Sequence, residues 1–173
     1  MGAWGAIIMS FFGALFAAMT LGLQLHWFGI VPGLPFLVFA LIALAAHRVI
    51  RLPGEGVAPS ERAGRAIMWS SIGEGVGLLV ASTIVTNIGH RDLLLPAMTL
   101  VVGLHFLPIA WAVPFRPFAV LGAALLATSA LGFALAQPLG GTVAGFAAAL
   151  ALTAASLLAL RRDRRARLIP GQV

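Results

Sequence analysis

The chain has 173 residues, of which 61% are hydrophobic and only 9% are charged, and its mean hydropathy is +1.04. A water-soluble domain of this length cannot cover its surface with so few polar residues, so a soluble globular protein is excluded and lipid is the expected solvent. The absence of cysteine excludes disulfides, thiolate metal sites and cysteine nucleophiles.

Hydropathy predicts an all-α, polytopic membrane protein whose single domain, residues 1–160, is a bundle of six transmembrane helices. Each apolar segment is close to the roughly 20 residues that a helix needs to cross a hydrocarbon core of about 30 Å. The predicted spans are 6–25, 28–46, 66–86, 93–113, 118–136 and 142–160, followed by a basic tail at 161–173.

The first segment carries small residues at Gly13, Ala14, Ala17 and Ala18, a spacing that lets two helices approach closely in lipid. No basic residue precedes this segment, so we expect it to be retained as a helix rather than removed as a secretory signal. The small residues are compatible with association with a second copy of the chain or with a partner membrane subunit.

The connections between the predicted spans contain residues that are typical of helix starts. Pro32 and Pro35 are expected in the first turns of the second segment, where a missing N–H costs least. In the polar loop 47–65, Ser60 is expected to cap a helix that begins near Glu61. Asp92 stands immediately before the fourth segment, where a carboxylate is suited to cap the helix N-terminus.

The basic residues predict the orientation. All eleven are arginines, and Arg91 is the one that falls on the side opposite to the other ten in a six-helix arrangement. Because arginine accumulates on the cytoplasmic side, both termini are expected in the cytoplasm, in a multi-pass protein of the inner (plasma) membrane. The basic tail is expected to contact anionic lipid headgroups rather than nucleic acid. The ten are Arg48, Arg51, Arg62, Arg65, Arg116, Arg161, Arg162, Arg164, Arg165 and Arg167.

Four tryptophans support the same arrangement. Trp4, Trp27, Trp69 and Trp111 each fall near the end of a predicted span. Their amphipathic rings favour the headgroup level, so we expect them to act as anchors at the membrane interfaces.

Glu74 and His105 are the candidate site. A carboxylate at bilayer depth is costly and is rarely kept without a partner or a task. Glu74 stands 12 residues before the end of the third span and His105 stands 12 residues after the start of the fourth. At 1.5 Å per residue, both side chains are expected roughly 18 Å from the outer boundary, near the middle of the membrane.

The surroundings of Glu74 favour a binding site. Ser70, Ser71 and several glycines in the run 70–77 leave room for a ligand or for another backbone. Pro108 also frees a backbone carbonyl near His105. The functional interpretation is a centre that binds a small molecule or a proton through Glu74, His105, Ser70 and Ser71. The alternative is a satisfied buried pair that only specifies how the helices pack.

The sequence contains no other motif that indicates a metal site, a cofactor or a catalytic centre. The histidines outside the candidate site are expected near the interfaces, so no metal site forms from sequence spacing, and no cofactor is expected. A phosphate-binding loop, a Ser-His-Asp arrangement and a zinc-protease motif are all absent.

The run from Gly103 to Ala110 (GLHFLPIA) resembles a GLHFLP-type motif of small uncharacterised bacterial inner-membrane proteins. This resemblance implies a polytopic membrane protein and no particular activity. In architecture the chain is also similar to the six-helix substrate-binding subunits of energy-coupling-factor vitamin transporters, which often carry an Ala-x-x-x-Ala motif in their first helix. Ala14 and Ala18 have that spacing, and the likeness is an analogy of architecture.

Three classes of function remain open. The first is a protein that binds or transports a small molecule, with or without coupling to protons, at Glu74 and His105. The second is a membrane-embedded enzyme that acts on a lipid or isoprenoid, with the same pair as acid and base. The third is a non-catalytic assembly protein, in which the helices would pack tightly at Glu74.

Overall fold

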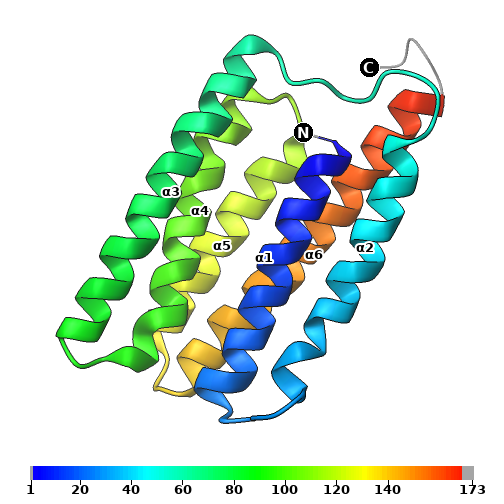
Figure 1. Cartoon of the computed structure of the whole chain (residues 1–173). Helices are drawn as coiled ribbons and strands as arrows, with labels where there is room; N and C mark the ends of the chain where they lie inside the picture. Colours follow the sequence, from blue (N-terminus) through cyan, green and yellow to red (C-terminus); the bar gives the residue numbers. More distant parts are fainter. Residues whose placement is uncertain (1, 169–173) are drawn as a thin grey trace.

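The computed structural model describes residues 2–168. Within that range six helices are long and apolar enough to cross a membrane, and they run side by side as one bundle (Figure 1). The first helix continues into a π-helical turn, Thr20–Gln24, and short 3₁₀ turns at Val31–Gly33 and Arg91–Leu93 precede the second and fourth. The helices are α1 (Ala3–Met19), α2 (Pro35–Ile50), α3 (Glu61–Asn87), α4 (Leu94–Ala112), α5 (Arg116–Ala134) and α6 (Leu139–Leu168).

Helix α6 is the element against which most of the bundle packs, since it contacts α1, α5, α4 and α2. Its buried face is built largely from glycine and alanine, which let neighbouring backbones come close. A Cβ placed on Gly13 of α1 would lie 3.1 Å from the Ala149 carbonyl oxygen of α6. Gly13 and Ala14 are therefore used for packing within this chain, where both are buried.

The core holds large apolar side chains, with Phe16, Leu95, Phe118 and Leu152 almost completely buried. Buried hydroxyls lie among them, and each is satisfied by a backbone carbonyl. The Thr20 hydroxyl, for example, donates to the Phe16 oxygen at 2.7 Å. Those of Thr99, Ser129 and Ser156 donate to Leu95, Pro96 and Thr153. These hydroxyls therefore leave no unpaired donor in the core.

Helix α3 stands at the edge of the bundle and packs along α4 (Figure 1). Only Ala63 and Val85 of its residues are buried. The two helices approach closely at Gly77, where an added Cβ would lie 2.9 Å from Cγ1 of Val101. Because α3 packs mainly against α4, its remaining faces can line a cavity or face the surroundings.

The turn between α3 and α4 sets their register. Gly89 adopts a φ of 79°, a left-handed conformation that glycine enters without strain, and the chain reverses there. Asp92 was expected to cap α4, but that expectation is wrong. Asp92 lies inside the 3₁₀ turn Arg91–Leu93, the residue at the cap position is Leu93, and no side chain caps the helix.

Two helix starts follow from local chemistry. The Ser60 hydroxyl accepts a hydrogen bond from the Ala63 N–H at 3.2 Å, and α3 begins at Glu61 as the sequence predicted. Helix α2 begins at Pro35 rather than near Phe28, because Pro35 has no N–H to continue a helix from Val31. Val31–Gly33 forms its own 3₁₀ turn instead.

The last helix continues past Leu160, through the basic run, to Leu168. Its end is fixed by Asp163, whose carboxylate accepts from the Val57 N–H at 2.7 Å and from Nε of Arg167 at 3.2 Å. Arg167 also donates to the carbonyl oxygens of Ile50 and Gly54. The connection between α2 and α3, which crosses this end of the bundle (Figure 1), is thereby held to α6.

The outer surface of the bundle is rich in large apolar side chains. All four tryptophans belong to it, with exposed fractions from 52% for Trp27 to 77% for Trp111. The guanidinium of Arg62 stacks on the ring of Trp111 at 3.7 Å from its centroid, which joins the start of α3 to the end of α4.

Candidate functional site

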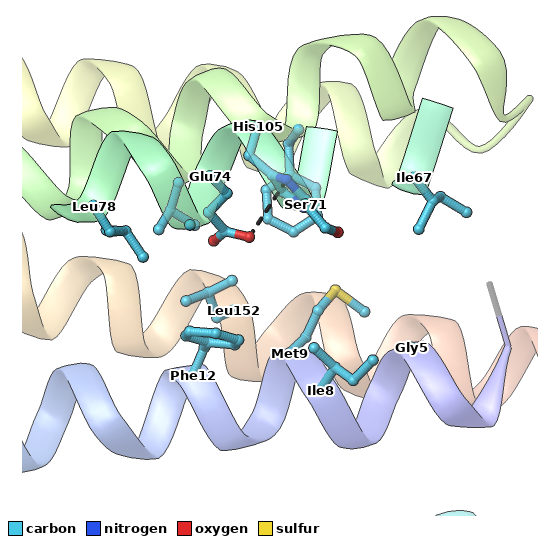
Figure 2. Close-up of a pocket in the computed structure, with 13 residues that line it drawn as sticks. Gly5, Ile8, Met9, Phe12, Ile67, Ser71, Glu74, Leu78, His105 and Leu152 are labelled. Carbon is cyan, nitrogen blue, oxygen red and sulfur yellow. Dashed lines mark ion pairs between the residues drawn. The ribbon is translucent and has the colours of Figure 1, made fainter. Parts of the chain in front are cut away.

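Glu74 of α3 and His105 of α4 lie against each other. Oε2 of Glu74 is 3.4 Å from Nδ1 of His105 (Figure 2). The exposed fractions of the two side chains are only 12% and 8%. The structure therefore brings together the two ionisable residues whose equal distance from the turn placed them at one depth.

The contact leaves a polar atom unsatisfied. The atoms are within ion-pair distance, but no hydrogen bond forms between them, and Nδ1 of His105 is buried without a hydrogen-bond partner among residues 2–168. The His105 ring lies edge-on to the ring of Phe106, with centroids 5.0 Å apart. Leaving a buried polar group unpaired costs about 1–3 kcal/mol, which a bound polar group could recover.

A cavity of about 290 Å³ lies beside this pair, and we call it the Glu74 cavity. Helix α1 forms the wall that faces α3 across it (Figure 2). Its volume is close to the lower end of the range of small-molecule sites. The residues that line it are Gly5, Ile8, Met9 and Phe12 of α1, Ile67, Ser71, Glu74, Gly75 and Leu78 of α3, Val102, His105 and Phe106 of α4, and Leu152 of α6.

The two serines have different positions. Ser71 lines the Glu74 cavity one turn from Glu74. Ser70 does not belong to the lining, and its hydroxyl donates to the Ile67 carbonyl oxygen at 3.1 Å within α3. The cavity thus meets the stripe 71, 74, 75 and 78 of the helix, which follows the i, i+3, i+4, i+7 pattern of one helical face.

Pro108 adds a further acceptor near the site. It lies inside α4, where it has no N–H to donate to the carbonyl of Leu104. The carbonyl precedes His105 directly, so polar capacity next to the imidazole exceeds what helix α4 itself uses.

The wall from α1 is the part of the site that the sequence did not indicate. Met9 is buried and Phe12 is half-buried, and both face Glu74 across the cavity (Figure 2). An apolar residue in an apolar span gives no pattern that distinguishes a cavity wall from a packed core. Gly5, which lies one turn before Met9 and also lines the cavity, has no side chain to fill it.

The chemistry of the site is that of a mainly apolar hollow with one polar end. A carboxylate accepts hydrogen bonds, and an imidazole donates or accepts according to its protonation. Within residues 2–168, no group of three or more histidine, cysteine, aspartate or glutamate side chains could hold a metal ion. The arrangement suits an organic molecule that is largely apolar and carries a hydrogen-bonding or cationic group.

Comparisons of the chain with protein-family models, with curated proteins and with solved structures gave no match.

Proposed function

We propose that the protein is a multi-pass integral membrane protein of the inner (plasma) membrane, with both termini in the cytoplasm. The apolar outer surface of the bundle supports insertion, because side chains such as Ile30, Leu41 and Leu79 are more than 60% exposed. The arginine distribution supports the orientation, because ten of the eleven arginines belong to the end of α2, the α2–α3 connection, the start of α3, the start of α5 or the end of α6. Figure 1 shows these segments at the end of the bundle where α1 begins.

Within that membrane the protein binds or transports a small molecule in the Glu74 cavity. The observation that carries this proposal is the buried, unpartnered Nδ1 of His105 beside the carboxylate of Glu74, at the edge of a cavity. A polar ligand group in the cavity, within reach of both atoms, would give Nδ1 its missing partner and would also contact the carboxylate. The pair can also hold one proton between its two basic groups, which is the feature that a proton-linked carrier requires.

The ligand class follows from the lining. Apolar walls from Ile8, Met9 and Phe12 favour a hydrophobic body, and the polar end favours a hydroxyl, amine or amide. Because the cavity is bounded by α1 and α3, the ligand reaches it from between these two helices, within the bilayer. A lipid-soluble molecule no larger than the hollow is the expected ligand.

The position of the cavity between α1 and α3 is also compatible with one enzymatic function. Glu74 and His105 could act as acid and base on a lipid or isoprenoid that enters between α1 and α3. The third alternative, a purely structural pair in an assembly protein, requires tight packing at Glu74, and a cavity of about 290 Å³ at that position argues against it.

The test is to purify the whole chain in mild detergent and to identify the small molecules that remain bound by mass spectrometry. Wild-type protein is compared with Glu74→Gln and His105→Ala, and with Asp92→Asn as a control. Asp92 takes part in the exposed pair with His90 at 3.9 Å and does not line the cavity. The proposal predicts a compound that is present in wild type and control and absent from the two site variants. A compound retained equally in all four would contradict it.

A further inference from the structure

A second cavity, of about 480 Å³, lies between the ends of α2 and α6, and it shares no lining residue with the Glu74 cavity. Three of its lining residues are arginines: Arg48, Arg161 and Arg164. The other lining residues are apolar, among them Val49 and Leu157. We call this hollow the arginine cavity.

The fold brings the three arginines to one place. Arg161 and Arg164 are three residues apart on α6 and therefore share a face. Arg48 lies in the last turn of α2. The ends of these two helices are held together because Nη1 of Arg167 donates to the Ile50 carbonyl oxygen at 3.2 Å, and Figure 1 shows them side by side.

The charge around this hollow is not balanced by the part of the chain that the structure describes. None of the ion pairs among residues 2–168 includes Arg48, Arg161 or Arg164. The nearest carboxylate along α6 belongs to Asp163, which is buried and is already engaged by Val57 and Arg167. Three cations around one hollow repel one another, and an anion between them would remove that repulsion.

The apolar part of the lining of the arginine cavity indicates which kind of anion fits it. Along α6 the lining changes from Leu157 and Leu160 to Arg161 and Arg164. This change occurs over seven residues, which is about 10 Å of helix. An amphiphile with an anionic head and an acyl chain matches both parts, whereas free phosphate would match only the arginines. Guanidinium groups bind phosphate oxygens through paired, charge-assisted hydrogen bonds.

We propose that the arginine cavity binds the phosphate group of an anionic phospholipid, with an acyl chain against the wall formed by Val49 and Leu157. The proposal rests on the membrane insertion argued above and is independent of any ligand at Glu74. It makes one bound lipid, rather than the bilayer surface in general, the partner of these arginines.

The experiment measures lipid binding to the purified whole chain by native mass spectrometry. Phosphatidylglycerol and phosphatidylcholine with identical acyl chains are the two probes. Wild-type protein is expected to bind phosphatidylglycerol preferentially. The triple variant Arg48→Gln, Arg161→Gln, Arg164→Gln is expected to bind it about 100-fold more weakly, at about fivefold for each arginine removed near a membrane surface. A Glu74→Gln variant should bind it as wild type does, which separates this site from the proposed ligand site.

The matched control is the triple variant Arg51→Gln, Arg116→Gln, Arg165→Gln. It removes the same charge at the same end of the bundle from residues that are exposed like the cavity arginines, but none of them lines the cavity. The control should keep the preference for phosphatidylglycerol. Equal loss in both triple variants would mean a general effect of surface charge and would overturn the proposal.

Two further measurements complete the lipid-binding experiment: a comparison of single variants and a competition with inorganic phosphate. If the triple variant fails to fold, the single variants Arg164→Gln and Arg165→Gln are compared, and only the first should lose about fivefold in binding. Inorganic phosphate is added as a competitor at the concentration of the lipid. Displacement of phosphatidylglycerol by free phosphate would assign the hollow to a soluble anion and refute a lipid site.

Discussion

The carboxylate of Glu74 lies 3.4 Å from the imidazole Nδ1 of His105, yet no hydrogen bond joins them and the nitrogen is buried. The pair ties α3, the edge helix, to α4 at a point where a cavity separates α3 from α1. An ion pair that served packing alone would be expected to satisfy both partners. From the unused hydrogen-bonding capacity beside the cavity we infer that the pair receives a third group, from a bound ligand.

Replacing Glu74 should remove binding without removing the fold. Glu74→Gln keeps the size of the side chain and loses the charge, so we expect ligand affinity to fall about 10- to 100-fold, the equivalent of about 1.5–3 kcal/mol for a hydrogen bond to a charged group. The melting temperature of the ligand-free protein should change little. Binding of the co-purified compound, measured by calorimetry, tests this, and unchanged affinity would exclude Glu74 from the site.

Filling the Glu74 cavity should block the ligand sterically. Gly75 lines the cavity, and an added Cβ there would meet no atom within 4 Å, so Gly75→Leu places a branched side chain in the hollow. Gly73→Leu is the matched control, because Gly73 is equally open but lies outside the lining. We expect ligand retention to be lost in the first variant and kept in the second. Equal retention in both would show that the ligand does not occupy this cavity.

The contact of α3 with α4 should depend on Gly77. In Gly77→Ala the added Cβ would lie 2.9 Å from Cγ1 of Val101, so we expect a loss of about 1–3 kcal/mol of stability from overpacking. Adding Val101→Ala to Gly77→Ala should recover part of that loss. Gly73→Ala meets no neighbour and should leave stability unchanged or raise it by up to about 1 kcal/mol. Thermal unfolding in detergent measures all three, and equal midpoints for Gly77→Ala and Gly73→Ala would contradict the packing described.

The loop between α2 and α3 should be released when Asp163 is removed. Asp163→Ala leaves the Val57 N–H and Nε of Arg167 without their shared acceptor, and because both donors are only partly buried we expect a cost at the lower end of about 1–3 kcal/mol for each. Trypsin should then cut faster after Arg51, in the loop. Glu61→Ala is the control, because its pair with Arg65 is exposed on both sides and is worth little. Equal rates of cleavage in wild type and Asp163→Ala would mean that Asp163 does not hold the loop.

The sequence predicted the positions of the helices along the chain better than the face that each helix turns toward its neighbours. Charge, hydropathy and the equal spacing of Glu74 and His105 from the turn were enough to place both residues on adjacent helices at one depth. The face of α3 that meets the cavity could not be predicted, because both its buried and its exposed sides are apolar, so hydropathy gives no direction. The site proposed from sequence therefore included both Ser70 and Ser71, whereas only Ser71 lines the cavity.

Other features depended on contacts between distant parts of the chain. The wall from Met9 and Phe12 arises only when α1 and α3 both pack near α4 and α6. The arginine cavity likewise requires Arg48 to meet Arg161 across more than a hundred residues of sequence. Spacing along one helix predicts neighbours within that helix, but it cannot identify partners on another helix.

We propose that a lipid-soluble molecule enters the cavity beside Glu74 from the membrane. The most direct test is to treat membranes that contain the protein with dicyclohexylcarbodiimide, a lipid-soluble reagent that modifies accessible carboxyl groups, and to locate the label by peptide mass spectrometry. We expect labelling at Glu74 that is blocked in Gly75→Leu and prevented when the compound co-purified with wild-type protein is added first. An unlabelled Glu74 in folded protein, or labelling that the compound does not prevent, would contradict it.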